Sequence, residues 1–134
     1  MKDTTREWVR KAESDFQLAA GIARRGEKFH DELCFHCQQA AEKYLKSLLE
    51  ELGQPIPKTH NLVTVLQLLV GFHKQLRTSR RGVDFLTRFA VGTRYPGDWA
   101  SKRQAVAALR WAERVRAECR TLLAIKPPRP RKRK

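Results

Sequence analysis

Apolar residues recur every three or four positions along most of this chain, and that spacing constrains the fold more than any other feature of the sequence. One face of an α-helix repeats with this period, whereas a half-buried strand alternates at every second residue. No segment shows a convincing strand alternation. The sequence therefore predicts an all-α fold, an antiparallel up-and-down bundle of four to five helices. The expected helices span residues 4–26, 31–53, 61–76 and 82–90, with a last one from 101 onward.

Local signals mark several of the expected helix ends. Thr4 with Glu7, and Ser101 with Gln104, have the spacing of a capping box, in which each side chain binds a backbone N–H group of the first turn. Gly26 fits the left-handed position that closes a helix. The first expected helix would bury Trp8, Ala12, Phe16, Ala19 and Ala23, and the third would bury Leu62, Leu66, Leu69 and Phe72.

The segment CFHC, residues 34–37, raises the question of a metal or redox site. Successive helical residues are about 100° apart, which places Cys34 and Cys37 on the apolar face of their helix. A zinc site needs about four ligands, and neither Cys119 nor the other histidines supply a second pair at suitable spacing. We therefore interpret the cysteines as core residues and expect no metal. His36 falls at the edge of that face, with one ring nitrogen in water.

With 134 residues the chain has the length of one domain. We expect the bundle to occupy residues 1–125, followed by a disordered basic tail over 126–134, where three prolines and six cations cannot pack. No apolar run approaches the roughly 20 residues that span a membrane, and the charged first residues are unlike a signal peptide. The odd number of cysteines, three, argues against a disulfide framework and favours the cytoplasm.

The net charge of +14 is unevenly distributed. Residues 1–73 carry ten basic and ten acidic side chains, whereas residues 74–116 carry eleven basic and three acidic ones. A neutral first half joined to a basic second half indicates a face for an anionic partner, with RNA or DNA first and an acidic protein second. The alternative is a basic face that is only solvated.

Four segments give the chain a resemblance to a known family. They are WVRKAESDF at 8–16, CFHCQQAAEKYLKSLL at 34–49, THNL at 59–62 and TRYP at 93–96, and spaced alanines follow in the last helix. In these segments the chain resembles the HEPN domains over nearly everything from Trp8 to Leu123. The block QQAAEKxLK is the most specific element.

The resemblance implies a bundle of four to five helices that forms a homodimer. Many HEPN proteins are metal-independent ribonucleases that use no cofactor, and several are toxins neutralised by a separate minimal nucleotidyltransferase. Others bind RNA or nucleotides without catalysis. In the nucleases, an arginine followed four to six residues later by a histidine forms the site, the histidine as general base and the arginine on the phosphate.

This sequence departs from that pattern. At the corresponding positions after Arg94 stand Trp99, Ala100 and Ser101, and none of them is a histidine. Arg25 and His30 have the formal spacing, but they lie at the first interhelical loop, where the family motif does not. We interpret that pair as a coincidence, and ribonuclease activity stays an open question at this point.

The stretch TRYPGDW, residues 93–99, is the first candidate site. Pro96 and Gly97 suit the central positions of a type II turn, which would present Arg94 and Tyr95 ahead of the last helix. Arg94 could bind a phosphate, and Tyr95 or Trp99 could stack on a base. The alternative is structural, with both aromatic rings capping the end of the bundle and Arg94 paired with a carboxylate such as Asp98.

Other candidates extend this site. On the last helix a basic stripe opposite the apolar face could follow a phosphate backbone, and His36 could contribute to RNA binding. Among catalytic candidates, His60 would join Arg94 and Tyr95, although such a histidine more often holds a loop by hydrogen bonding. The stripe consists of Arg103, Arg110 and Arg114.

Two functional hypotheses follow. The first is the HEPN half of a toxin–antitoxin-like pair with a nucleotidyltransferase partner, acting on or binding RNA. The second is a non-catalytic helical module that binds a nucleotide, an RNA or a partner protein. Cleavage of RNA without metal would separate them.

Overall fold

The computed structural model describes residues 1–91 and 95–127, and these residues form five α-helices and a 3-10 helix without any strand. The helices are α1 (Asp3–Arg24), α2 (His30–Glu51), α3 (Leu62–Leu69), α4 (Arg80–Thr87) and α5 (Lys102–Leu122), with η1 (Lys74–Ser79) before α4. The all-α antiparallel bundle predicted from the periodicity is confirmed. Within the described ranges no helix has the length and apolarity needed to cross a membrane.

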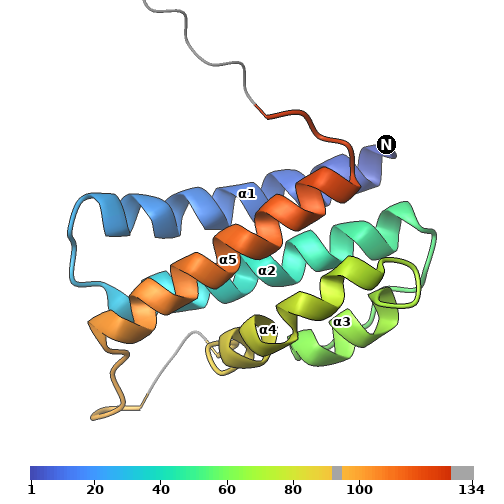
Figure 1. The fold of residues 1–134 in the computed structure, drawn as a ribbon. Coiled ribbons are helices and arrows are strands. Elements are labelled where there is room, and N and C mark those ends of the chain that lie inside the picture. Colours follow the sequence, from blue (N-terminus) through green and yellow to red (C-terminus); the bar gives the residue numbers. More distant parts are fainter. Residues whose placement is uncertain (92–94, 128–134) are drawn as a thin grey trace, which may run out of the picture.

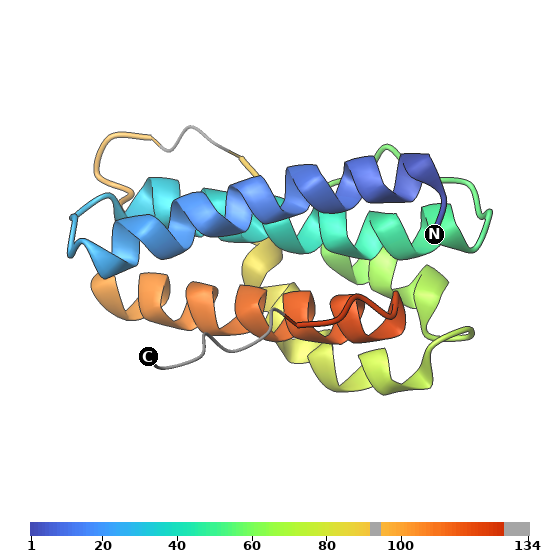
Figure 2. The ribbon, with the colours of Figure 1, turned by 90° about the horizontal axis from the view of Figure 1, so that it is seen from above.

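The three long helices pack along one another, with α1 antiparallel to both α2 and α5 (Figure 1). Seen from above, α1 covers α2, while α5 lies to one side and α3 and α4 close the remaining side (Figure 2). The shared core is made mainly by the apolar face of α2, where Tyr44, Leu45 and Leu48 are buried. As a result α2 contacts every other α-helix.

The cysteines are part of this core, as predicted. Cys34, Cys37 and Cys119 are fully buried and reduced. Burial raises the pKa of the Cys37 and Cys119 thiols well above the ordinary value, because a thiolate would lose its hydration. Neutral buried thiols of this kind behave as small apolar side chains.

One close contact joins α4 to α5. The ring of Trp111 lies against the backbone of Gly82, and a Cβ atom at that position would be 2.1 Å from a ring carbon. Only glycine allows this approach. The contact sets the distance between α4 and α5.

The first helix differs from prediction at both ends of its apolar stripe. It begins at Asp3 without a side-chain cap, so the predicted capping box of Thr4 and Glu7 is wrong. Instead the neighbouring Thr5 hydroxyl donates to the Glu51 carboxylate at 2.9 Å, an interaction with the end of α2. The buried stripe is shifted by one residue at its ends, and Val9 and Ile22 are buried where Trp8 and Ala23 were expected.

The third helix is shorter than predicted. It ends at Leu69, and Phe72 is 53% exposed although it was expected in the core. Gly71 explains the difference, since glycine destabilises a helix interior, and the chain tightens there into a turn in which the Phe72 N–H donates to the Leu69 carbonyl. Residues 74–79 then form the 3-10 helix.

Other predicted ends are confirmed. Gly26 closes the α1 end at φ +67°, and Gly53 follows α2 at φ +70°. The capping box of α5 is present, with the Gln104 N–H donating to the Ser101 hydroxyl at 3.0 Å and the Ser101 N–H donating to the Gln104 side chain at 2.9 Å. The predicted tail begins with the exposed residues Lys126 and Pro127, and residues 128–134 lie outside the described ranges.

Candidate functional site

The turn before α5 has the predicted geometry. The Asp98 N–H donates to the Tyr95 carbonyl at 2.9 Å, and Gly97 has φ +89°, as the third position of a type II turn requires. Tyr95 is 85% exposed and Trp99 is 75% exposed, which rules out the alternative in which both rings cap the end of the bundle. Arg94, the first-choice phosphate ligand and catalytic candidate, lies outside the described residues.

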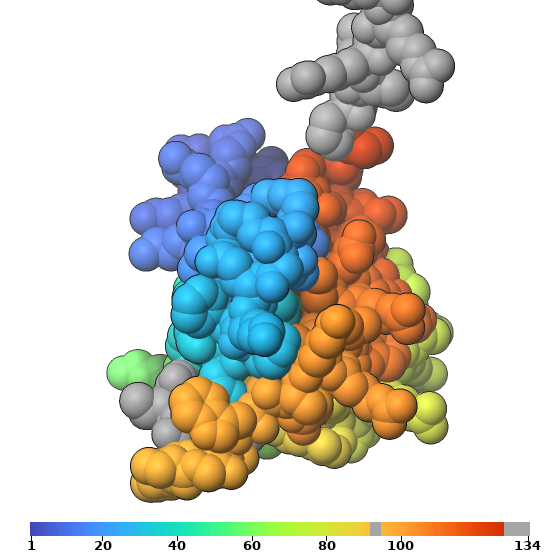
Figure 3. Space-filling model, turned by 90° about the vertical axis from the view of Figure 1, so that its left-hand side faces the viewer, coloured from blue at the N-terminus to red at the C-terminus, as the bar shows by residue number. Residues whose placement is uncertain are grey.

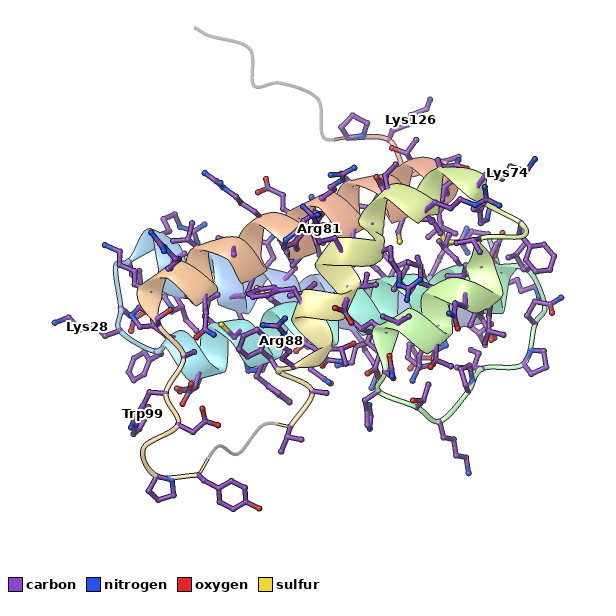
Figure 4. All side chains as sticks on the ribbon, turned by 60° about the horizontal axis from the view of Figure 1, so that its bottom comes forward. Lys28, Lys74, Arg81, Arg88, Trp99 and Lys126 are labelled. Atoms are coloured by element: carbon purple, nitrogen blue, oxygen red, sulfur yellow. The ribbon has the colours of Figure 1, made fainter. Side chains whose placement is uncertain are left out.

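A hydrogen bond joins the end of this turn to α2. The buried Ala100 donates its N–H to the Asp31 carboxylate at 2.7 Å, which holds the start of α5 beside the start of α2. The preceding residues lie on the side of α2 away from α5 (Figure 2), and Trp99 projects outward from that end (Figure 4). The exposed aromatic rings and the α5 stripe therefore belong to two different surfaces.

The basic stripe of α5 forms one surface. Arg103, Arg110 and Arg114 line a groove of about 700 Å³ along the helix together with Lys102. Trp111 forms part of its floor, and the Arg114 guanidinium lies 5.5 Å from the centre of the Trp111 ring. Within the part of the chain that the structure describes, no carboxylate lines the groove, although Arg114 pairs with Glu118 at 3.5 Å just beyond it. Of the described residues, none forms an ion pair with Arg103 or Arg110.

His60 is held by a buried carboxylate. Its Nδ1 lies 2.9 Å from Glu42 Oε1, while 64% of its side chain is exposed. Glu42 also pairs with Lys46 at 3.2 Å and accepts a hydrogen bond from Gln38. The prediction that His60 holds a loop by hydrogen bonding is consistent with this contact, and the arrangement leaves Nε2 for another group.

The same network explains the polar residues of the QQAAEKxLK block. Gln38, Glu42 and Lys46 occupy successive turns of α2 and are buried. Gln38 donates to the His60 carbonyl at 3.2 Å, and Lys46 donates to the Thr59 carbonyl at 3.0 Å. These bonds satisfy buried polar groups that would otherwise be costly. They fix the loop that leads into α3.

His36 takes part in a separate cluster between α1 and α2. Its Nδ1 lies 2.8 Å from one oxygen of Asp15, and Lys43 Nζ lies 2.5 Å from the other. The ring is partly exposed, as predicted for a residue at the edge of the apolar face. It does not line the α5 groove.

One charged cluster was not found from the sequence. Glu13 of α1 accepts two hydrogen bonds from the Arg116 guanidinium of α5, at 2.6 and 2.8 Å, and a third from the Tyr44 hydroxyl of α2. Partial burial would raise the pKa of Glu13, but the hydrogen bonds from Arg116, Tyr44 and Gln17 lower it to about 2. Burial and the bond to Glu13 raise the pKa of Tyr44 to about 12.

This cluster joins the three long helices. Arg116 also lies over the Phe16 ring, 4.9 Å from its centre. In the sequence Glu13 lies 31 residues from Tyr44 and 103 residues from Arg116, so no local spacing could have found these contacts. Among the described residues, no group of three or more His, Cys, Asp or Glu side chains could hold a metal ion.

Comparisons with known proteins agree with the fold. The HEPN domain model matches residues 5–122. The crystal structure of TT1696 from Thermus thermophilus superposes with a TM-score of 0.77 at 25% identity, covering 90% of this chain and 98% of that one. ST0689, described as an archaeal HEPN homologue, superposes with a TM-score of 0.72 at 21% identity, covering 92% and 99%.

No curated protein sequence matches this chain. The family model nevertheless covers most of its length, from the first turns of α1 to the end of α5. The resemblance noted in the sequence is therefore confirmed at the level of the family. The chain belongs to the HEPN domain family.

Proposed function

We propose that this HEPN protein binds RNA, and that the α5 groove is its phosphate-binding surface. The observation that carries the proposal is the set of four cations, Lys102, Arg103, Arg110 and Arg114, that line this groove without a carboxylate among them. Guanidinium groups suit phosphates because they donate paired hydrogen bonds in a fixed geometry. Neutralising several phosphates releases counterions, which supplies most of the affinity for RNA.

The exposed aromatic rings support single-stranded RNA as the ligand. Tyr95 and Trp99 offer flat faces to solvent on the neighbouring surface. Stacking of a base on such a ring contributes about 1–3 kcal/mol. An RNA that follows the α5 groove and passes its first turn would reach these rings.

Family membership supports a partner as well. We propose that the protein acts as a homodimer and as the HEPN half of a pair with a minimal nucleotidyltransferase, because many HEPN proteins do so. Co-purification of the two proteins as a complex of fixed stoichiometry would support the pairing. A partner that never co-elutes would contradict it.

The RNA proposal is tested by titrating a labelled single-stranded RNA at several salt concentrations. Arg103→Glu with Arg110→Glu should weaken binding at least about tenfold and flatten the salt dependence, by about 0.7 in log–log slope for each phosphate that the protein no longer neutralises. Arg10→Glu, which changes an exposed arginine of α1, is the matched control. If the control weakens binding as much as the double variant, the α5 groove is not the site.

A second candidate function is a metal-independent ribonuclease on the other surface, and the His60–Glu42 pair favours it. A carboxylate on Nδ1 orients an imidazole and leaves Nε2 to take a proton from a ribose 2′-hydroxyl. The turn with Tyr95 and the loop with His60 both lie on the side of α2 away from α5 (Figure 2). Arg94 would supply the positive charge that binds the phosphate.

The cleavage test uses transfer RNA and a mixed single-stranded RNA in EDTA. Cuts that disappear in both His60→Gln and Arg94→Ala would support a ribonuclease. Intact RNA that is nevertheless bound would leave the non-catalytic binding module as the function. The α5 variants separate the two proposals, because they should weaken binding without removing the catalytic groups.

A further inference from the structure

The α5 groove has an apolar floor that phosphate binding alone does not require. Residues four apart lie on the same face of a helix, so Arg103, Ala107 and Trp111 form one row along α5. Val106 also lines the groove and is 48% exposed. Phosphates would contact the cations, and this apolar surface would stay in water unless another part of the ligand covers it.

The small side chain of Ala107 leaves room in this row. Ala107 stands between the longer side chains of Arg103 and Trp111, and all three line the groove. The groove measures about 700 Å³, which is within the range of small-molecule sites. A flat group could therefore lie over Ala107 beside the Trp111 ring, with cations around it.

The Trp111 ring is held in place before any ligand binds. The ring lies against the backbone of Gly82, and the Arg114 guanidinium is 5.5 Å from its centre. It is nevertheless partly exposed and lines the groove. A side chain that is already fixed loses little conformational freedom on binding, so this ring suits the stacking of a nucleic-acid base.

The floor of the groove is separate from the two exposed rings before α5. In the view of the end at which α5 begins, the turn that carries Tyr95 and Trp99 lies at the lower left, whereas α5 runs to the right beside η1 (Figure 3). Base-dependent binding that survives the removal of Tyr95 and Trp99 therefore belongs to the groove.

We propose that the α5 groove binds one unpaired base of RNA together with its flanking phosphates. This inference rests on the proposed RNA-binding function and specifies which part of the RNA the groove recognises. The base lies over Ala107 against the Trp111 ring, and Arg103 and Arg110 bind the phosphates on either side. A base inside a duplex is stacked between its neighbours, so the groove selects single strands.

The test uses a protein in which Trp111 is the one remaining tryptophan. Trp8→Phe, Trp99→Ala and Tyr95→Ala remove the other tryptophans and the exposed tyrosine. The probes are hexa-adenylate and an abasic ribose–phosphate chain with the same number of phosphates. Hexa-adenylate should bind at least about fivefold more tightly, the effect of stacking one base, and should quench Trp111 fluorescence saturably. The abasic chain should bind without quenching.

A second variant tests the space over Ala107. Ala107→Leu fills that space and keeps every cation, so hexa-adenylate should bind it only as tightly as the abasic chain does. Ala117→Leu is the matched control, at an exposed position of α5 that does not line the groove, and should keep the full preference.

The outcomes separate this inference from the proposed function. Equal affinity for the two probes, unquenched Trp111 fluorescence, or a preference that Ala107→Leu leaves intact would overturn the base site. The RNA proposal would still stand if Arg103→Glu with Arg110→Glu weakened binding of the abasic chain. If neither probe bound, both proposals would fail.

Discussion

Replacing Glu13 with glutamine should destabilise the bundle in a manner that depends on pH. The pKa of Glu13 is lowered from an ordinary 4.5 to about 2, because the native state holds the charged carboxylate against Arg116 and Tyr44. Each pKa unit corresponds to about 1.4 kcal/mol, so the full effect is about 3 kcal/mol. A quarter of the Glu13 side chain is exposed, and solvent screening reduces the expected loss in Glu13→Gln to about 1–2 kcal/mol at pH 7.

The sign of the pH dependence follows from the lowered pKa. The carboxylate contributes its stability above pH 4.5, where it is charged in both folded and unfolded chains. Below that pH the unfolded chain takes up a proton before the folded one does, and the contribution is lost as the pH falls toward 2. The difference in unfolding free energy between wild type and Glu13→Gln should therefore shrink over this window.

Urea unfolding followed by circular dichroism at pH 7, 5, 4 and 3 measures this difference. Glu7→Gln is the control, because Glu7 is an exposed carboxylate on the same helix. Combining Glu13→Gln with Arg116→Gln should cost less than the sum of the single changes, since both remove the same contact. The reasoning would be refuted if Glu13→Gln lowered the free energy of unfolding by less than about 0.5 kcal/mol at pH 7. It would also be refuted if the decrease stayed constant down to pH 3.

Three further changes can be checked by urea unfolding at pH 7. Gly82→Ala should cost about 2–3 kcal/mol because its Cβ would lie 2.1 Å from a packed tryptophan ring, whereas Gly71→Ala, with open space around it, should cost nothing measurable. Glu42→Leu should cost about 3–5 kcal/mol because Lys46 stays buried without its charged partner, and a loss below 1 kcal/mol would contradict that view. Ser101→Ala should cost about 1 kcal/mol by removing the α5 capping box, and an unchanged midpoint would count against it.

The RNA-binding proposal and the ribonuclease proposal can be tested separately, because their residues lie on two different surfaces. Loss of RNA binding in the α5 variants with His60 intact would locate the phosphate contacts on α5. Loss of cleavage in His60→Gln with binding retained would locate chemistry beside Glu42.

Local sequence signals determined much of the helical framework. The apolar period predicted the helices, the Ser101–Gln104 pair predicted the start of α5, and Pro96–Gly97 predicted the turn before it. Cys34 and Cys37 were correctly assigned to the core from their position on the helix. These features depend on residues within about one helical turn of each other, so the order of side chains along the chain is enough to specify them.

Tertiary structure decided the rest. The chain turns at Gly71 instead of continuing the third helix, and Phe72 is left exposed. Whether the basic stripe of α5 lies on the same surface as the turn before α5 depends on how that turn packs beside α2, and the two prove to be on different surfaces (Figure 2). The contact of Glu13 with Arg116 joins residues 103 positions apart. The physical reason is that periodicity specifies which face of a helix is apolar, whereas only the packing of the helices brings polar groups from different helices within hydrogen-bonding distance.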